Sequence, residues 1–393
     1  MRRELIFMDA KSSKFWNIEL DGSSHTVTYG RIGSKGQSST KTFASDEAAR
    51  KDAEKLIIEK TGKGYVDAAP AAVEGDEGIP FVAFTGISRR EDIFRNAGTF
   101  VGLRVVDYEP TKPAKSDVAY RFRSEWEGKS VEDELTHFLA TEAALSTTAL
   151  VIGAWQGNDS SRPPDDVIAV LVKNKARLPK LLALYLGDII SEENEMSWIY
   201  QSDLSPLLEA FPRLQLLRAR GGQSLAFSKP EHANLRALIL ETGGMAGTVV
   251  RSLGTSKFPN LEYLELWLGT DEYGGNTTVD DLRPILLGEA FPNLKHLGLR
   301  NSDIADSLAA ALADSLVVNK IETLDLSLGT LSDAGGFALL GLKSPGLKRL
   351  NLHHHYMGSE IVKQLKTLPY NVDVSNPTEM DVDEDYRFVA VGE

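Results

Sequence analysis

From residue 181 onward, leucines recur in a fixed pattern of apolar and polar positions. The pattern reads Leu-x-x-Leu-x-Leu with a few Ala or Ile substitutions, and its copies start at Leu181, Leu214, Leu235, Leu261, Leu294, Ile321 and Leu347. Successive starts lie 33, 21, 26, 33, 27 and 26 residues apart. A degenerate earlier copy contains Leu150 and Ile152. The alternation within each copy predicts a short strand, and the recurrence predicts a repeat architecture.

Copies at this spacing are typical of leucine-rich repeats, which have about 20–29 residues per unit. A single repeat cannot bury its own apolar face, so the stack of repeats is the stable unit. Proline in three lead-ins, such as Phe258-Pro259, ends the preceding segment. We therefore predict an α/β solenoid over residues 146–376. Its parallel sheet is expected on the concave side, and helices such as 304–316 and 359–368 on the convex side.

Residues 1–66 follow a different pattern, in which short β-type runs alternate with turns. The runs are residues 5–8, 15–20, 25–31 and 40–43. Ser45 is a suitable N-cap for a helix whose apolar stripe includes Ala49, Ala53 and Leu56. The pattern predicts a small antiparallel sheet with one helix laid across it.

Two segments of this front module carry a family resemblance. Tyr29-Gly30-Arg31-Ile32-Gly33-Ser34-Lys35-Gly36-Gln37 and Glu59-Lys60-Thr61-Gly62-Lys63-Gly64-Tyr65 resemble a WGR domain, named for its Trp-Gly-Arg signature. Such domains occur in DNA-damage-sensing poly(ADP-ribose) polymerases and in many bacterial proteins. Here Tyr29 stands in place of the signature tryptophan.

The resemblance implies a binding role for the signature segment. In the polymerases, the domain contacts a DNA end and also meets neighbouring domains. Carried over, Tyr29 would stack on a sugar or base, and Arg31, Lys35 and Gln37 would complete a nucleic-acid or protein contact. The alternative is that the glycines serve only a tight hairpin and that Tyr29 belongs to the core.

Three further segments complete the expected organisation. Residues 67–79, rich in Ala, Gly and acidic side chains, predict a linker. Residues 80–145 offer β-type runs at 81–84, 100–108 and 118–122, then a helix over 131–145 capped by Ser130. We expect them to cap the first repeat, whose apolar end would otherwise be exposed. Residues 377–393 are expected to form an acidic C-terminal tail, whose stretch Glu379–Asp385 is expected to be solvated.

The solenoid half also resembles an uncharacterised bacterial leucine-rich-repeat family that is sometimes joined to a WGR domain. The segments that suggest it are Leu186-Gly187-Asp188-Ile189, Leu266–Gly275 and Phe388-Val389-Ala390-Val391. This resemblance supports the fold and implies no activity.

Side chains between the inward leucines should face the concavity, where a partner would bind. The candidates are Tyr185, Arg218, Arg220, Tyr263, Glu265, Trp267, Arg300 and His353. Aromatic and arginine side chains commonly anchor protein interfaces. We expect Trp267, beside Tyr263, to be solvent-facing and central to partner binding. The alternative is that Trp267 packs against Tyr263 and His296 and binds nothing.

Catalytic and metal-binding patterns are weak. The chain has no cysteine, which excludes thiol catalysis and Cys-ligated metals. The sequence contains no Walker loop, dinucleotide fingerprint, Gly-x-Ser-x-Gly elbow or His-Glu-x-x-His. His353 and His355 with Asp325 could hold zinc or iron, which would make the protein a metal-dependent enzyme. We expect neither a metal nor another cofactor.

Charge and hydropathy set the expected environment. Residues 1–66 hold 12 basic and 9 acidic residues, and the remainder holds 31 basic and 47 acidic ones. Nucleic-acid contact is therefore expected only at the front module. No apolar run approaches membrane-spanning length, so we expect a cytoplasmic, bacterial protein. The expected function is a non-enzymatic interaction scaffold that binds protein partners. The alternative is a DNA-end or nucleic-acid sensor.

Overall fold

The structure is a computed structural model of the 393-residue chain. It describes residues 2–9, 12–31, 36–63, 65–67, 78–115, 117–124, 128–379 and 386–392. The chain divides into two compact units, Met1–Ala71 and Ala72–Glu393. Each unit is described by itself.

The first unit is a sheet crossed by one helix, as the sequence predicts. Among its described residues, five antiparallel strands follow the order β4-β3-β2-β1-β5. Their bounds are Arg2–Asp9, Ser12–Asp21, Ser24–Arg31, Gln37–Thr42 and Val66–Asp67 for β1 to β5. Helix α1 (Asp46–Gly62) begins at Ser45, whose hydroxyl accepts from the Ala48 amide at 3.2 Å. Leu5, Trp16 and Ile57 are buried in its core.

The second unit is a curved solenoid, confirming the predicted fold class. Within the described residues, twelve strands form one sheet in chain order from β17 back to β6. All neighbouring pairs from β7 to β17 are parallel, and β6 is antiparallel to β7. The bounds from β6 to β17 are Thr99–Phe100, Leu103–Asp107, Val118–Phe122, Ala149–Ile152, Ala183–Leu186, Leu216–Arg220, Ala237–Glu241, Tyr263–Gly269, His296–Ser302, Thr323–Asp325, Arg349–Asn351 and Asn371–Asp373.

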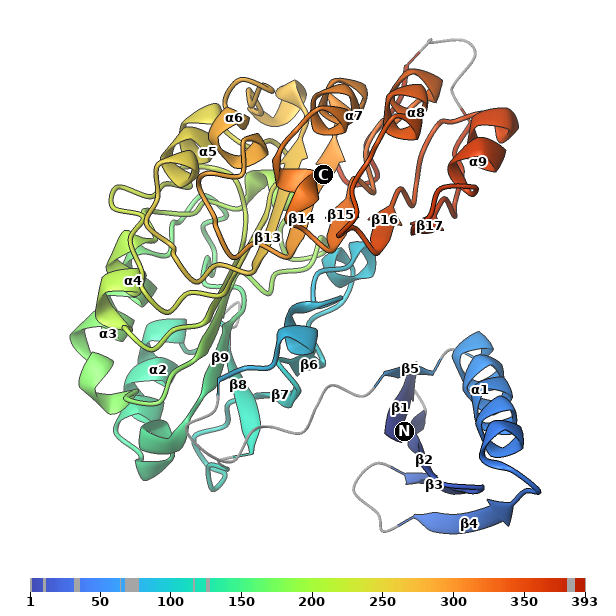
Figure 1. The fold of residues 1–393 in the computed structure, drawn as a ribbon. Helices are drawn as coiled ribbons and strands as arrows, with labels where there is room; N and C mark the ends of the chain where they lie inside the picture. The colour runs from blue at the N-terminus through green and yellow to red at the C-terminus, as the bar shows by residue number, and fades with distance from the viewer. Residues whose placement is uncertain are drawn as a thin grey trace. The chain divides into compact units, whose positions relative to one another are not determined.

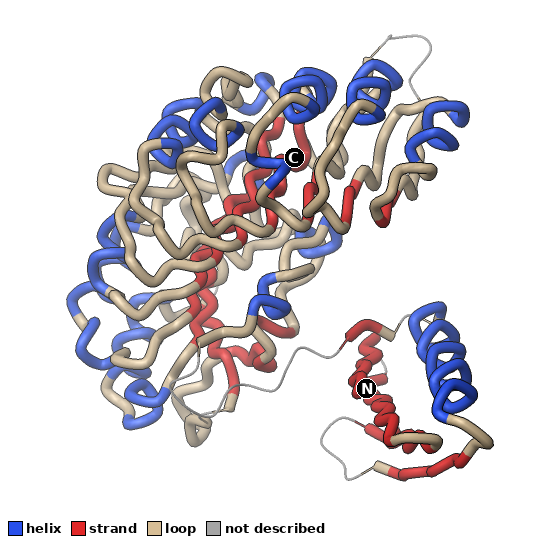
Figure 2. The backbone as a smooth tube through the Cα atoms, in the orientation of Figure 1, coloured by secondary structure: helices blue, strands red, loops and turns tan. Residues whose placement is uncertain are grey.

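Helices line the convex side of this sheet (Figure 1), while the strands run through the solenoid as one continuous ladder (Figure 2). Helices α2 to α9 are Val131–Leu139, Asp165–Lys173, Ser205–Ala210, Gly247–Gly254, Arg283–Leu286, Ala305–Ala313, Asp333–Leu340 and Ser359–Leu365. Single 3₁₀ turns, η1 to η7, are Phe81–Phe84, Arg90–Ile93, Glu142–Ser146, Lys175–Arg177, Met196–Trp198, Asp271–Tyr273 and Val317–Asn319.

The sheet separates two apolar layers. Leu184 and Leu186 of β10 pack in the large core beneath the helices. Tyr185, between them, packs in a second cluster on the concave side. This alternation follows from the two-residue period of a strand. The leucine pattern therefore predicted correctly which side chains point to which face.

Residues 78–130 differ in part from their predicted structure. Strands β6 to β8 continue the solenoid sheet, and Ser130 caps α2 by accepting from the Asp133 amide at 3.1 Å. Residues 81–84, predicted as a strand, form the 3₁₀ turn η1 instead. The predicted run 100–108 is broken at Val101 and Gly102, whose φ angles of 45° and 85° make the β6–β7 turn. Helix α2 is also shorter than predicted.

The chain end differs more. Residues 377–393 are predicted as an acidic tail separate from the solenoid, but Val391 is buried against the solenoid. The acidic residues 380–385 lie outside the described residues. Among the described helices, none combines the length and apolar character that crossing a bilayer requires.

Candidate functional site

The concave face brings the sequence-predicted aromatic and arginine side chains together. Strand pairing places Tyr185 beside Arg218, and Trp267 beside Arg300. With Glu241, the assembled side chains form what we call the concave network: Tyr185, Arg218, Arg220, Glu241, Tyr263, Glu265, Trp267 and Arg300. Every member is buried.

Glu241 is the centre of one half of the network. Its Oε1 accepts from Nε of Arg218 at 3.0 Å, and its Oε2 accepts from Nε of Arg220 at 2.8 Å. The Ser88 hydroxyl also donates to Glu241. Burial would raise the pKa of Glu241, but the two guanidinium groups outweigh it and hold this pKa below its usual value. Glu241 is therefore an ionised structural partner.

Tyr185 lies beneath the two arginines. The guanidinium carbon of Arg218 sits 4.1 Å from the centre of the Tyr185 ring, a cation–π geometry. Burial strongly raises the pKa of the Tyr185 hydroxyl, so this phenol stays protonated. A phenolate acting as a base is therefore not favoured here.

Glu265 is the centre of the other half. It accepts from the Tyr263 hydroxyl at 2.7 Å, from the Trp267 indole nitrogen at 2.8 Å and from Arg300 at 2.6 Å. Burial opposes ionisation of Glu265, but the guanidinium of Arg300 keeps its pKa below the usual value. Three neighbouring side chains thus donate to one carboxylate.

His296 adds a buried neutral ring to this half. It stacks on Tyr263 with ring centres 3.9 Å apart and planes 7° from parallel. Burial lowers the pKa of His296 to about 4, so the ring is neutral at physiological pH. Its Nε2 is buried without a hydrogen bond and lies 3.9 Å from Glu265.

The concave network is covered by residues 78–98, which we call the strap. Strap carbonyls accept from the network's arginines: Ile87 from Arg218, Asp92 from Arg220 at 2.8 Å, and Ser88 from Arg300 at 3.0 Å. Phe84 of the strap packs on Tyr263 with ring centres 6.5 Å apart.

The expectation that Tyr185, Arg218, Arg220, Tyr263, Glu265, Trp267 and Arg300 face solvent is wrong. Their direction was predicted correctly, but the chain's own strap fills the concavity above them. No periodic pattern in residues 78–98 indicated this packing.

Residues 386–392, which we call the clasp, close the same face near β14 (Figure 1). Val391 of the clasp forms an apolar cluster with Ile93 of the strap, Met196, Trp267 and Leu328. Trp267 is fully buried at the point where strap and clasp meet. This explains why a tryptophan occupies the middle of a strand on the concave side.

Beyond the strap, the last repeats present a polar surface that we call the open floor: Arg349, Asn351, His353, Asn371, Asp373 and Ser375. None of these side chains is fully buried. A hollow of about 430 Å³ lies at its edge, between Arg349, Asp373 and Lys366 of the α9 end. Of the predicted partner-binding residues, His353 lies in the open floor, and its Nδ1 lies 2.8 Å from the Ser375 hydroxyl.

The alternative metal site does not assemble. His355 is fully buried, with Nε2 3.1 Å from the Val374 carbonyl and Nδ1 accepting from the Met357 amide. His354, between the two candidate ligands, has a φ of 62°, so 353–355 do not alternate as a strand would. Within the described ranges, no three His, Asp or Glu side chains are grouped to hold a metal.

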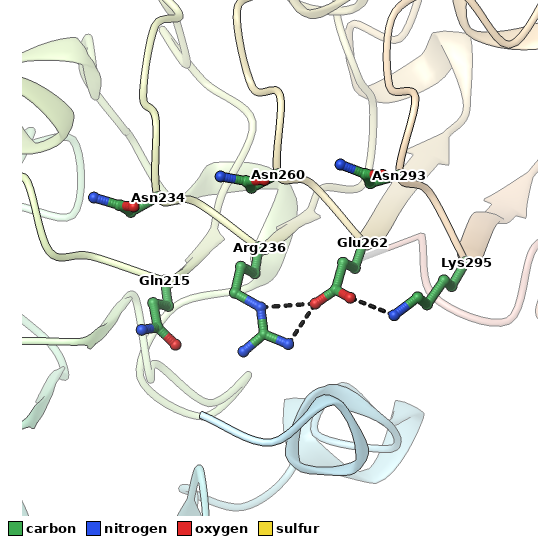
Figure 3. A pocket seen from close by; sticks show the side chains of 7 residues that line it. All are labelled: Gln215, Asn234, Arg236, Asn260, Glu262, Asn293 and Lys295. Carbon is green, nitrogen blue, oxygen red and sulfur yellow. Dashed lines mark hydrogen bonds and ion pairs between the residues drawn. The ribbon is translucent and has the colours of Figure 1, made fainter. Parts of the chain in front are cut away.

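A second polar cavity was not predicted. It has a volume of about 310 Å³ and lies at the beginning of β11 to β14. One row of its lining is Asn234, Asn260 and Asn293, and the other is Gln215, Arg236, Glu262 and Lys295 (Figure 3). Each asparagine donates to a carbonyl of the preceding repeat, at 2.7–2.9 Å. Glu262 pairs with both Arg236 and Lys295. The recurring Phe-Pro-Asn-Leu lead-ins were the available signal. Gln215 accepts from the Ile79 amide at 2.7 Å, and Arg236 also donates to the Ile79 carbonyl, so the lining is bonded to residue 79 as well as within the repeats.

In the first unit, Tyr29 is 46% exposed and its hydroxyl lies 3.4 Å from Oε1 of Gln37. Tyr29 of β3 is paired with the buried Trp16 of β2 on one side and with Gln37 of β4 on the other. The side chain of Arg31 and all of Lys35 lie outside what the structure describes. Of the predicted signature residues, Tyr29 and Gln37 are therefore placed together on an accessible surface.

Comparison with known proteins agrees with the two units. The WGR domain family matches residues 1–72, confirming the resemblance predicted for about 1–66. YfeS of Escherichia coli is 46% identical over 65 residues, and YehF of the same organism is 45% identical over 67 residues. These matches cover 16% and 17% of this chain and 27% and 24% of the two relatives, so the chain spans about a quarter of their length.

A crystal structure of a Bacteroides fragilis protein matches the whole chain. It is 31% identical, covers 99% of both chains and superposes with a TM-score of 0.70. The chain belongs to the family of this protein. Family membership therefore extends over the WGR unit and the solenoid together.

Proposed function

We propose that this member of the family is a non-enzymatic interaction scaffold. The WGR unit recruits one partner, and the solenoid binds a second, protein partner. The observation that carries the proposal is the contrast within the concave face. The charged side chains of the concave network are paired with one another and buried. The open floor, in contrast, has accessible polar side chains beside a hollow of about 430 Å³.

The carboxylates of the network also support a role without catalysis. Glu241 and Glu265 are buried and bonded to arginine, so neither is positioned to exchange protons with a substrate. The absence of cysteine from the sequence fits a reducing cytoplasm, which is the compartment that we propose.

The proposed binding of a protein partner at the open floor can be tested by reversing the exposed charge of Arg349 and removing the ring of His353. Arg349, 53% exposed at its side chain, lies 3.9 Å from Asp373. In a pull-down with the full chain as bait, Arg349→Glu together with His353→Ala should lose most of the captured protein partner. Lys173→Glu, the matched charge reversal on convex helix α3, should retain it. Equal capture by both variants would place partner binding elsewhere.

The second candidate function, nucleic-acid binding by the WGR unit, is favoured by its charge of +3 against −16 for the remainder. Exposed Tyr29 offers a stacking surface of the kind that binds bases.

Electrophoretic mobility shift at two salt concentrations tests this candidate. If it holds, Arg31→Ala with Lys35→Ala weakens binding and flattens its salt dependence, because phosphate contacts release counterions. The control pair Arg50→Ala and Lys51→Ala, on helix α1, should bind like the parent chain. A parent chain with no affinity for a DNA end at low salt would remove this candidate and leave the protein-recruiting role of the WGR unit.

A further inference from the structure

Four consecutive repeats have a non-glycine residue in the left-handed backbone region at the same register. Asn301, Leu328, His354 and Asn376 have φ angles of 51°, 70°, 62° and 58°. Asn301 lies near the end of β14, and the other three follow β15, β16 and β17. Side chains disfavour this conformation, so its persistence requires surrounding contacts that impose it. Such positions often coincide with binding sites.

The first three of these residues contact the clasp. The Asn301 side chain donates to the Val391 carbonyl at 2.6 Å and accepts from the Val391 amide at 3.0 Å. The Leu328 carbonyl accepts from the Ala390 amide at 2.8 Å. His354 Nε2 lies 3.5 Å from the Phe388 carbonyl. These three left-handed residues therefore contact the backbone of a segment from the chain end.

Two hydroxyls extend the same recognition. The Tyr356 hydroxyl donates to the Phe388 carbonyl at 2.9 Å and accepts from its amide at 3.0 Å. The Ser197 hydroxyl donates to the Gly392 carbonyl. Side chains that bind both the amide and the carbonyl of one residue recognise a peptide in one register, largely independently of its sequence.

Side-chain specificity comes from the two ends of the groove. Val391 inserts among Ile93, Trp267 and Leu328 and is buried. At the other end, Arg387 donates to Asp306 at 2.9 Å and to the Thr330 carbonyl at 2.7 Å. Between them, Phe388 remains 52% exposed beside a hollow of about 420 Å³. The groove thus selects a basic residue followed, four positions later, by a small apolar one.

We propose that this groove is a peptide-binding site that the clasp occupies in cis. Its ligand in trans is a peptide segment with the clasp's own pattern: Arg, an aromatic residue, then small apolar residues. The site is separate from the open floor, so it stands independently of the proposed function. An external peptide must compete with a tethered one, whose effective concentration is high.

The test uses a fluorescent peptide with the sequence of residues 386–392 and fluorescence anisotropy with the full chain. Val391→Glu would place a charge in the apolar cluster and unseat the clasp. This variant should bind the peptide at least tenfold more tightly than the parent chain. Adding Asn301→Gly to this variant removes the side-chain amide, while glycine still adopts the left-handed backbone. The double variant should therefore bind the peptide at least tenfold more weakly than Val391→Glu alone.

Asn376→Gly is the matched control for Asn301→Gly, because Asn376 has a φ of 58° in the next repeat and is exposed. Added to Val391→Glu, it should leave peptide affinity unchanged. A folded Val391→Glu chain that does not bind the peptide, or that binds it equally well with and without Asn301→Gly, would overturn the proposal. If Val391→Glu unfolds, a chain ending at Glu379 replaces it, with the same expectations. Unfolding of both would show that the clasp is an integral part of the core and would also overturn the proposal.

Discussion

Trp267 shows how the direction and the exposure of a side chain are set by different parts of the molecule. The strand pattern turns its indole toward the concavity, while Ile93 and Val391, distant in sequence, bury it. Its nitrogen also donates to Glu265 at 2.8 Å. Removing the indole would leave a cavity and one fewer donor for a buried carboxylate.

We therefore expect Trp267→Ala to lower the free energy of unfolding by about 3–5 kcal/mol, measured by denaturant titration. Trp198, which is 53% exposed, provides the matched control. Trp198→Ala should change the free energy of unfolding by less than about 0.5 kcal/mol. Similar losses in both variants would mean that Trp267 is not enclosed. The sequence could not distinguish the two tryptophans, because both lie in the solenoid half and only packing separates them.

His296 predicts a pH dependence of stability. Its folded-state pKa is about 4, below the ordinary value of 6.5. Between these values the unfolded chain binds a proton that the folded chain does not, so the free energy of unfolding falls as the pH is lowered. The loss assigned to His296 is about 3 kcal/mol between pH 7 and pH 4.

His296→Phe keeps a ring to stack on Tyr263 and should reduce that acid-dependent loss by a similar amount. Denaturant titrations at the two pH values measure the difference. His353→Phe, at the open floor, should show the parent's pH dependence. If His296→Phe also kept the parent's dependence, His296 would not be buried as a neutral ring.

At the scale of elements, the strap is anchored by one face of a short 3₁₀ turn. Within η1, Phe84 is fully buried against Tyr263, whereas Val82 is 53% exposed. Phe84→Ala should therefore cost about 3–5 kcal/mol of stability, and Val82→Ala less than about 0.5 kcal/mol. Thermal unfolding followed by circular dichroism compares them. Equal midpoints for the two variants would show that the strap does not pack as described.

Strands were predictable and the strap was not, for a physical reason. Leu264 and Leu266 repeat a strand period that every neighbouring repeat reinforces, so local pattern and global fold agree. Phe81–Phe84 is a short apolar run without period, which fits a strand or a helical turn equally. The clasp offered one signal: the apolar residues 388–391 come two residues after an acidic stretch, and an apolar run is unsuited to a solvated tail.

At the scale of the whole molecule, the chain combines a WGR unit with a solenoid whose concave face is partly filled from within. The candidate residues Tyr29 and Gln37, which the family resemblance covers, lie on an accessible surface, and their role in binding stays a prediction. Seven of the concave candidates, all except His353, were predicted to be exposed but are buried. The contacts that bury them, such as Ser88 with Glu241, join residues far apart in the chain and leave no local pattern in the sequence. Binding is therefore expected beside the covered network.

The central claim, that strap and clasp cover the concave network, is tested most directly by hydrogen exchange with mass spectrometry on the full chain. The account predicts strong protection of amides that donate to buried or ordered acceptors: Ala83 to Pro80, Ala97 to Asp188, and Val391 to Asn301. Peptic fragments spanning residues 81–97 and 386–392 should exchange far more slowly than an unstructured peptide. Exchange of both fragments at the unstructured rate would contradict the account, because the concave network would then be open to solvent.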